Sequence, residues 1–323
     1  MATSKYTKRT RAVRRIASGS STSGAQLRLQ LNRDHLIAEH KINVLATQTY
    51  AGGAPTSVDV RDFIASVALE TSDGRRVFLT GAQAYDLGRW TESNVLVSNS
   101  AFGTGANTSR FSFEIHHEND GALLDLLTAL RSNELSTVDL VLTFPALGAN
   151  GFKGGTTATA CAYDVTVDSF DYEMLTETQF GQPLGSAKHY QEKLGSKTGT
   201  AAGSQPDIDL ITGNLTRFIV LHAYDTATTA VPTLADTIIG NLRLNVNGRD
   251  YLVSNGVELR QMNVLKRGVN SAGLFIIDFG DDENGWLDLR NVQQAKLQWD
   301  VLAGTPAGYR VDVSQDFTRG KMQ

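Results

Sequence analysis

The dominant pattern along the chain is alternation of apolar and polar residues in short runs rich in β-branched and aromatic side chains. Period-two alternation predicts strands with one buried face, and the Gly, Asn, Asp, Ser and Thr residues between the runs predict turns. The clearest runs are LRLQL (27–31), FSFEI (111–115), VDLVLTF (138–144), YDVTV (163–167), LRLNV (242–246) and YRVDV (309–313). The pattern therefore predicts an all-β fold of antiparallel strands.

Helical periodicity is scarce. The best match is DGALLDLLTALRSN (120–133), and SAKHYQEKLG (186–195) is a weaker one. We therefore expect one or two short helices beside the strands.

Five sequence blocks occur twice in the same order, which predicts a tandem duplication. HKINVLA (40–46) aligns with TRFIVLH (216–222) at an offset of 176, and the hairpins SDGRR and VNGRD align through Gly74 and Gly248 at 174. The blocks FSFEIHHENDGALLDL, LSTVDLVLTF and AYDVTVDSFD align with LFIIDFGDDENGWLDL, VQQAKLQWDV and GYRVDVSQDF at 164, 157 and 146. Asn-Gly predicts a two-residue turn in the second hairpin, and the Ser-Asp-Gly turn of the first is expected to be one residue longer.

Each copy contains about eight strand-like segments, which fit a jelly-roll sandwich. The predicted organisation is a basic flexible arm at 1–23, a first jelly roll at 24–172, a linker at 173–205, and a second jelly roll with a short tail at 206–323. The linker is rich in Gly, Ser, Thr and Gln.

Charge is distributed unevenly along the chain. The net charge is −4, but six basic residues precede position 16, and without them 24 basic residues face 34 acidic ones. These six are Lys5, Lys8, Arg9, Arg11, Arg14 and Arg15. A basic, Ser/Thr-rich arm is expected to contact phospholipid headgroups, nucleic acid or an acidic face of a neighbouring subunit, or else to serve as a solubilising tail.

Composition excludes several classes of protein. Hydrophobic residues make up 41% and charged residues 20% of the 323 residues, which fits a folded protein and not a disordered one. No apolar run approaches the roughly 18 residues of a membrane span, and the N-terminal segment lacks the apolar core of a secretory signal. Cys161 is the only cysteine, so the chain cannot form an internal disulfide, and folding in a reducing cytoplasm is expected.

Candidate chemical sites are few. His116 and His117 are adjacent on a predicted strand, so their side chains point to opposite faces and a solvated or interface position is expected instead of a shared metal. The turn DFGDDENG (278–285) carries carboxylates of the kind that calcium uses, although a turn that ends a strand explains them equally. Those carboxylates are Asp278, Asp281, Asp282 and Glu283. Cys161 lies in an alternating run, which predicts a buried, unreactive thiol. We expect neither a catalytic site nor a bound cofactor, with structural calcium as the one ion that the turn could hold.

The second copy carries the segments LTRFIVLHAYD, IIGNLRLNVNGRDYLVSNGVELRQMNVLKRG and LFIIDFGDDENGWLDLRNVQQAKLQWDV. Their Asn-Gly hairpin, Gly-x-Glu-Leu segment, Ile-Asp-Phe strand and Leu-Asp-Leu step resemble the double jelly-roll major capsid proteins of tailless icosahedral bacteriophages with an internal membrane. These are the corticovirus and tectivirus type, whose fold adenovirus hexon shares. The resemblance covers residues 24 to 316 and rests on order and pattern.

The resemblance implies a structural coat protein that forms pseudo-hexagonal homotrimers, which tile a virus shell around an inner membrane. The implied partners are neighbouring trimers, a vertex (penton) protein and the viral membrane beneath the arm, without sequence-specific nucleic-acid binding. Location in the virion, after synthesis and assembly in the host cytoplasm, is also implied.

Two alternatives come from other classes. A glycan-active enzyme would need paired carboxylates and exposed aromatic residues in a cleft, but the three tryptophans (Trp90, Trp286 and Trp299) do not cluster with acids in the sequence. A glycan-binding module or phage spike would form isolated trimers only.

Overall fold

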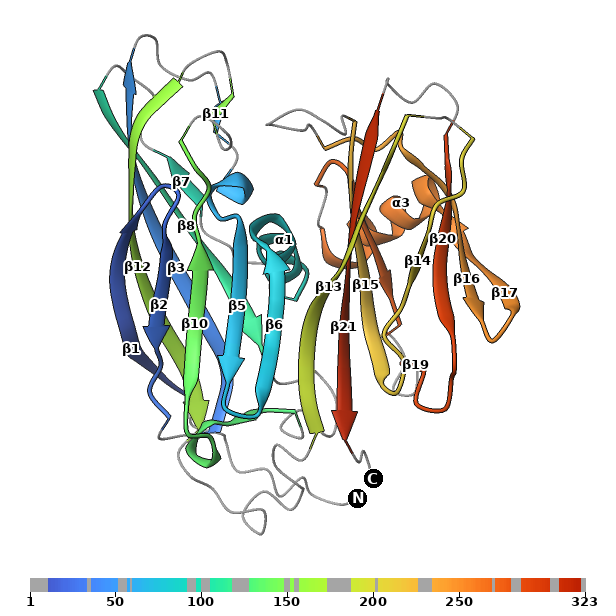
Figure 1. Cartoon of the computed structure of the whole chain (residues 1–323), viewed down its shortest axis with the longest axis horizontal. Helices are drawn as coiled ribbons and strands as arrows, with labels where there is room; N and C mark the ends of the chain where they lie inside the picture. Colours follow the sequence, from blue (N-terminus) through green and yellow to red (C-terminus); the bar gives the residue numbers. More distant parts are fainter. Residues whose placement is uncertain are drawn as a thin grey trace.

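The molecule consists of two β-sandwiches that stand side by side, and the strand axes of both run in roughly the same direction (Figure 1). We call them lobe 1 and lobe 2. The structure, a computed structural model, describes residues 11–33, 36–51, 57–58, 60–91, 97–99, 105–117, 128–147, 152–153, 157–172, 187–200, 203–225, 234–268, 271–279, 286–302 and 308–320.

Lobe 1 has an outer sheet packed against an inner sheet. The outer sheet contains, in spatial order, β1 (Arg11–Thr22), β12 (Thr157–Tyr172), β3 (Leu36–Ala51), β8 (Gly105–His116) and β7 (Val97–Asn99), with β9 (Leu130–Arg131) beside β3. The inner sheet contains β2 (Gln26–Gln30), β10 (Val138–Thr143), β5 (Ser66–Thr71) and β6 (Gly74–Thr80). A small ladder joins β4 (Ser57–Val58) to β11 (Phe152–Lys153).

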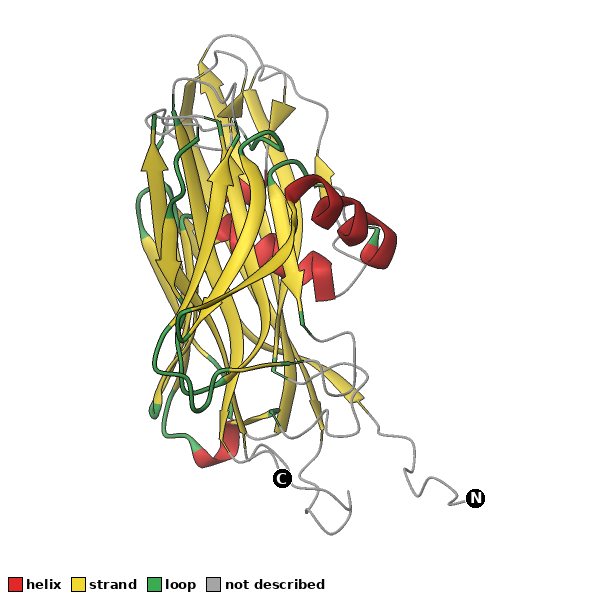
Figure 2. Ribbon diagram, turned by 90° about the vertical axis from the view of Figure 1, so that its right-hand side faces the viewer, coloured by secondary structure: helices red, strands yellow, loops and turns green. Residues whose placement is uncertain are grey.

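Lobe 2 repeats this plan. One of its sheets contains β13 (Ala187–Gly199), β21 (Tyr309–Gly320), β15 (Leu215–Tyr224) and β18 (Leu274–Asp278), with β19 (Leu287–Asp288) beside β15. The other contains β14 (Asp207–Asp209), β20 (Ala295–Val301), β16 (Ile239–Val246) and β17 (Arg249–Asn255). Among the described residues the helices are α1 (Gly81–Thr91) and α3 (Gly256–Arg267), and the 3-10 turns are η1 (Val60–Phe63) and η3 (Ser132–Glu134) (Figure 2).

Strand order identifies both lobes as jelly rolls. The eight main strands of each lobe are arranged as first, eighth, third and sixth in one sheet and second, seventh, fourth and fifth in the other. Two lobes with the same order confirm the predicted double jelly roll.

The repeat predicted from sequence is confirmed in strand order, and in two blocks also in register. Leu142 and Trp299, which the predicted offset of 157 relates, are the buried counterparts on β10 and β20. Tyr163 and Tyr309, which the predicted offset of 146 relates, are the buried counterparts on β12 and β21.

The predicted offset of 176 between β3 and β15 was wrong. Ile42 lies opposite Val167 on β12, and Leu221 lies opposite Val313 on β21. Because Val167 and Val313 are counterparts, the offset of these strands is 179. The earlier alignment matched Ile42, which faces the core of lobe 1, with Phe218, which points away from the core of lobe 2.

Both predicted hairpin turns contain two residues. Val246 pairs with Arg249 across Asn247 and Gly248, whose φ angles of 49° and 80° are those that an Asn-Gly turn supplies. In the first hairpin Thr71 pairs with Gly74, so that turn is not longer than the second. Its extra residue is Arg76, which bulges from the ladder between Arg75 and Val77.

The basic arm predicted at 1–23 is corrected for residues 11–22, which form β1. This strand pairs with β12 along its whole length, from Arg11 opposite Tyr172 to Thr22 opposite Ala162. Its sequence has few large apolar side chains because β1 is an edge strand, and only Ile16 and Ala17 pack partly on the core. Residues 1–10 lie outside the described part of the chain.

The linker predicted at 173–205 is also corrected, because residues 187–199 form β13, the first strand of lobe 2. The expected helix at 186–195 was therefore wrong. Polar residues that resembled a helix face, such as His189 and Gln191, are buried in a central strand and hydrogen-bonded there. Residues 173–186 lie outside the described residues.

The other expected helix, 120–133, is described only from Thr128 onward, where β9 and η3 follow in place of an α-helix. The two α-helices, α1 and α3, were not predicted. Both follow the hairpins directly, and both begin with a glycine. No helix among the described residues is long and apolar enough to cross a membrane.

Candidate functional site

The two lobes are joined through a continuous sheet, and this junction is the most elaborate polar site among the described residues. β6 of lobe 1 pairs in parallel with β13 of lobe 2, with Val77 opposite Gln191 and Phe78 opposite Glu192. The inner sheet of lobe 1 thereby continues into lobe 2 as nine strands. We call this junction the seam: β6 and α1 on the side of lobe 1, and β13, β15, β18 and β21 on the side of lobe 2.

Ion pairs cross the seam next to the parallel ladder. Asp73 in the first hairpin turn accepts a hydrogen bond from Arg76 of its own lobe at 2.7 Å and forms an ion pair with Lys188 of lobe 2 at 2.7 Å. Partial burial alone would raise the pKa of Asp73, but the bonds from Lys188 and Thr71 and the charge of Arg76 lower it to about 2. This carboxylate is therefore charged at any physiological pH.

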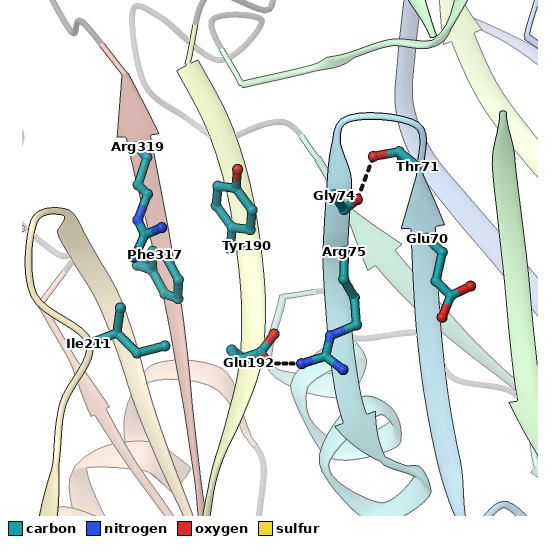
Figure 3. Close-up of a pocket in the computed structure, with 9 residues that line it drawn as sticks. All are labelled: Glu70, Thr71, Gly74, Arg75, Tyr190, Glu192, Ile211, Phe317 and Arg319. Carbon is teal, nitrogen blue, oxygen red and sulfur yellow. Dashed lines mark hydrogen bonds and ion pairs between the residues drawn. The ribbon is translucent and has the colours of Figure 1, made fainter. Parts of the chain in front are cut away.

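A groove of about 570 Å³ opens over the seam (Figure 3). Its lining residues are Glu70, Thr71, Gly74 and Arg75 from lobe 1 and Tyr190, Glu192, Ile211, Phe317 and Arg319 from lobe 2. Tyr190 and Phe317 stack with their ring centroids 5.3 Å apart, and the Arg319 guanidinium lies over both rings.

The groove does not provide the acid pair that the enzyme alternative requires. Its two carboxylates are each held by an arginine, Glu192 by Arg75 and Glu70 by Arg28 at 2.7 Å. A glycosidase needs one carboxyl group that donates a proton and a second that attacks or activates water. Two arginine-bound carboxylates instead serve to hold the strands together.

Helix α1 fills the space between the two lobes. It packs on β8 of its own lobe and on β15 of lobe 2. The apolar cluster of lobe 1 continues across this contact into lobe 2, where it includes Phe218, Val220, Leu274 and Ile276. β15 and β18 are consequently buried on both faces, because their alternate residues Ile219 and Phe275 belong to the core of lobe 2.

A buried contact between a histidine and a carboxylate fixes α1 to lobe 2. His222 Nε2 on β15 lies 2.9 Å from Asp86 Oδ2 on α1, and both side chains are fully buried. Arg61 Nη1 approaches the same carboxylate at 3.5 Å. Beside this pair, Arg89 of α1 donates a hydrogen bond of 3.1 Å to Ser271 Oγ of lobe 2.

A second buried group, made of histidines, occupies the part of the seam near the first hairpin turn. His40 Nδ1 and His117 Nε2 lie 2.9 Å apart. His189 of β13 lies between the lobes: its Nδ1 is 2.7 Å from the His116 carbonyl oxygen of lobe 1, and its Nε2 is 2.8 Å from Asp316 Oδ1. Five of the chain's six histidines are thus buried, four of them in this group and His222 beside α1.

Burial keeps part of this group neutral. Burial lowers the pKa of His40 to about 3, and burial together with the positive fields of His40, His189 and Arg76 lowers the pKa of His117 well below its ordinary value. Asp316 is the opposite case: burial would raise its pKa, but its contacts with His189 lower the pKa overall.

Of the solvated or interface position expected for His116 and His117, the solvated alternative was wrong, since both side chains are buried. Their side chains do meet different partners. His116 lies 3.7 Å from the carboxylates of Glu39 and Glu114, whereas His117 contacts His40. Among the residues that the structure describes, no group of three or more metal-ligating side chains is placed to hold an ion.

Of the four carboxylates of the acidic turn, the structure describes only that of Asp278, at the end of β18. Calcium at Asp281, Asp282 and Glu283 stays a prediction on residues outside the described ranges. Cys161 is buried on β12, and burial raises the pKa of its thiol, as expected for an unreactive cysteine.

Of the six basic residues predicted as a contact site, three lie outside the described part of the chain and three lie on β1. Lys5, Lys8 and Arg9 lie outside the described residues. Arg14 pairs with Asp171 at 3.4 Å, and Arg15 donates to Asp168 at 2.8 Å, so both bind β12 of their own lobe. The backbone of Arg11 pairs with Tyr172.

Comparison with known proteins gives a likeness of fold. No family model and no curated protein sequence matches the chain. Solved structures do: the MCP of Sulfolobus Turreted Icosahedral Virus (STIV) aligns over 92% of this chain and 96% of its own at 13% identity, with a TM-score of 0.66. The PBCV-1 virus capsid model aligns over 97% and 95% at 14% identity, with a TM-score of 0.59. The major capsid protein P2 of bacteriophage PM2 aligns over 97% and 99% at 12% identity, also with a TM-score of 0.59. The chain has the double jelly-roll fold of these proteins.

Replacing Asp86 with alanine should destabilise the protein by about 3 to 5 kcal/mol, because it leaves His222 and Arg61 without their buried partner. Urea unfolding at pH 7.5 measures the change. Asp209→Ala is the matched control: Asp209 is 75% exposed and lies 3.7 Å from Lys296, so its loss should cost less than about 1 kcal/mol. Equal stabilities of the two variants would contradict a structural role for the buried pair.

The free energy of unfolding should fall as the pH is lowered from about 7 to 5. The pKa values of His40 and His117 are depressed in the fold, so the unfolded chain, in which histidine titrates near 6.5, takes up protons first. Each histidine should cost up to about 2 kcal/mol over this range, and His40 continues to contribute until about pH 3. Urea unfolding across this range should show a shallower slope for His40→Gln, and an unchanged slope would exclude His40 as a source.

Proposed function

We propose that this chain is a major capsid protein, a structural and non-catalytic protein whose copies form the shell of an icosahedral virus. The observation that carries the proposal is the double jelly roll itself, with two lobes joined in one continuous sheet and a match to viral capsid proteins along nearly the whole chain. The groove over the seam, with both carboxylates bound to arginines, supports a structural role over the glycan-active alternative.

We further propose a homotrimer as the building block. Within one chain the lobes are arranged head to tail, because an edge of lobe 1 (β6) meets the first strand of lobe 2 (β13). Three such chains in a closed ring would present six similar lobes, and a six-lobed block can tile flat facets of a shell. At a five-fold vertex such a block does not fit the symmetry, which favours a separate vertex protein as partner alongside neighbouring trimers.

An inner membrane is the proposed partner of Lys5, Lys8 and Arg9. β1 begins and β21 ends at the same end of the molecule (Figure 1), so Arg11, the residue that follows the basic segment, lies at that end. Clustered Lys and Arg residues are attracted to anionic headgroups by about 1 kcal/mol each. Arg14 and Arg15 contribute less, because they pair with β12.

The purified protein should have a solution mass of three times the 34.9 kDa chain, and electron microscopy should reveal six-lobed blocks and their hexagonal arrays. Light scattering coupled to gel filtration measures the mass. A strictly monomeric protein that forms no arrays would overturn the capsid proposal, and isolated trimers that bind glycans would favour the spike alternative.

Removing residues 1–10 should abolish binding to anionic vesicles while leaving the trimer intact, because β1 and its ladder with β12 are retained. Co-sedimentation with phosphatidylglycerol vesicles measures binding. The variant Lys5→Gln, Lys8→Gln, Arg9→Gln separates charge from length and should lose binding equally. Undiminished binding of both variants would contradict the membrane role.

A further inference from the structure

Helices α1 and α3 occupy equivalent positions in the two lobes. Gly81 and Gly256, related by an offset of 175, each begin a helix against a carbonyl group of their own lobe. A Cβ atom on Gly81 would lie 2.1 Å from the Ile64 oxygen, and one on Gly256 would lie 2.4 Å from the Ile239 oxygen. The same offset relates Ile64 to Ile239, so both the helices and the sites on which they rest correspond.

The faces that the helices turn toward their own lobes also correspond. Ala84 and its counterpart Leu259 are both buried. One turn later, Gly88 packs against the backbone of Glu114 on β8, and its counterpart Asn263 hydrogen-bonds the backbone of Ile276 on β18 at 2.9 and 3.0 Å. The two helices are therefore seated alike within their lobes.

The opposite faces differ sharply in exposure. In α1 the stripe formed by Ala82, Asp86, Arg89 and Trp90 is directed toward lobe 2, where Asp86 bonds His222 and Arg89 bonds Ser271. Trp90 is only 1% exposed. Its counterpart in α3, Leu265, is 84% exposed.

The whole counterpart stripe on α3 is uncovered. Its members, which the same offset relates to the four residues of α1, are Val257, Gln261, Val264 and Leu265. Val257 is 57% and Val264 38% exposed, and with Arg260 and Asp236 the four residues line an apolar groove. In Figure 1, α3 lies in lobe 2 on the side of β15 opposite to α1. Lobe 2 covers α1, whereas the described part of the chain contains no third lobe that could cover α3.

The edges of the sheets show the same asymmetry. β6 pairs with β13 across the seam, but their counterparts β17 and β1 each pair, among the described strands, on one side only. β17 and β1 lie at opposite ends of the molecule (Figure 1). The molecule therefore has an open sheet edge with an uncovered helix on the side of lobe 2, and an open sheet edge on the side of lobe 1.

The exposed large apolar side chains gather on these open elements. Among the described residues they are Val13 on β1, Tyr251 on β17, Val257, Met262, Val264 and Leu265 on α3, and Leu147 and Leu302 elsewhere. Six of the eight thus lie on the two open ends. Exposed apolar residues concentrated in this way mark an interaction surface.

We propose that the α3 stripe and the β17 edge dock on the β1 edge and the outer face of β3 in a second copy of this chain, repeating between chains the junction made within each. The proposal rests on the proposed trimer and assigns its contact surface. With the offset of 179 between β3 and β15, the counterpart of His222 is Asn43, so Gln261 of one copy should approach Asn43 of the next as Asp86 approaches His222.

The receiving face is more polar than its counterpart in lobe 2. On β3, Asn43 donates a hydrogen bond to Asp168 at 2.9 Å, and Lys41 forms an ion pair with Glu114 at 2.8 Å. On β15, by contrast, the residues that face α1 include the apolar Phe218 and Val220. This difference has a physical reason: the face on β15 is covered as soon as the chain folds, whereas on β3 Lys41 and Asn43 are only half-buried in the single chain and stay partly exposed to water until another copy arrives. A polar receiving face keeps the unassembled chain soluble.

Leu265→Glu tests the assignment. It should convert the trimer to monomers, measured by light scattering, with the unfolding free energy of the monomer unchanged because Leu265 is largely exposed in the single chain. Leu147→Glu, which changes another exposed leucine away from the open ends, should remain trimeric. If the wild type is trimeric and Leu265→Glu is equally trimeric, the surface assignment is overturned while the trimer stands. A monomeric wild type overturns both.

A cross-link identifies the receiving face. In a Cys161→Ser background, Gln261→Cys with Asn43→Cys should join chains into covalent trimers with a short bismaleimide, whereas Gln261→Cys with Leu147→Cys should not. The elements that carry the first two positions, α3 and β3, belong to different lobes on opposite sides of the molecule (Figure 1), so a bond between them links different copies. Equal yields from the two pairs would overturn the choice of β3.

Discussion

The structure depends on one parallel strand pairing, that of β6 with β13. Every other ladder in the described residues is antiparallel and lies within one lobe, whereas this one makes a single sheet out of two sandwiches. Because one face of that sheet serves the core of lobe 1 and the other serves the core of lobe 2, β15 and β18 must be apolar on both faces. The lobes are consequently not independent domains on a linker, and α1 is a shared element of both.

The sequence was sufficient for the fold class, because alternation on strands such as β12 and β20 reports one buried face directly. The sequence was insufficient for strands in which buried and exposed residues do not alternate as apolar and polar ones. β1 is an edge strand that is held by backbone bonds and by pairs such as Arg15 with Asp168, so it lacks an apolar pattern. β13 is central but buries His189 and Gln191, whose partner Asp316 lies far away in the sequence, on β21. A one-dimensional pattern cannot reveal a polar residue that is satisfied by a distant strand.

The helices escaped prediction for a related reason. α1 is buried on nearly all sides between two lobes, and its polar residues Asp86 and Arg89 face lobe 2 instead of water. α3 exposes apolar residues that a solvated helix would not carry. For α1 the cause of this departure from the usual amphipathic pattern is contact with lobe 2, and for α3 it is the proposed contact with a second copy. The glycines that begin them, Gly81 and Gly256, were visible in the sequence, and their offset of 175 follows that of the hairpins closely. The histidine group of the candidate site could not be predicted from the sequence. Its residues come from β3, β8, β13 and β21, which meet only in the folded chain.

The polar seam also explains why the duplicated lobes do not associate in a wrong register. An apolar junction between similar sheets would tolerate a shift of two residues, since period-two alternation then restores the pattern. Here a shift would separate Asp86 from His222, Asp73 from Lys188, and His189 from the His116 carbonyl oxygen. The contacts of Asp86 with His222 and of His189 with His116 are buried, so their loss is costly, and only one register satisfies all three contacts. We infer that the buried charges of the seam serve to fix the relative position of the lobes, which a regular shell requires more than it requires additional stability.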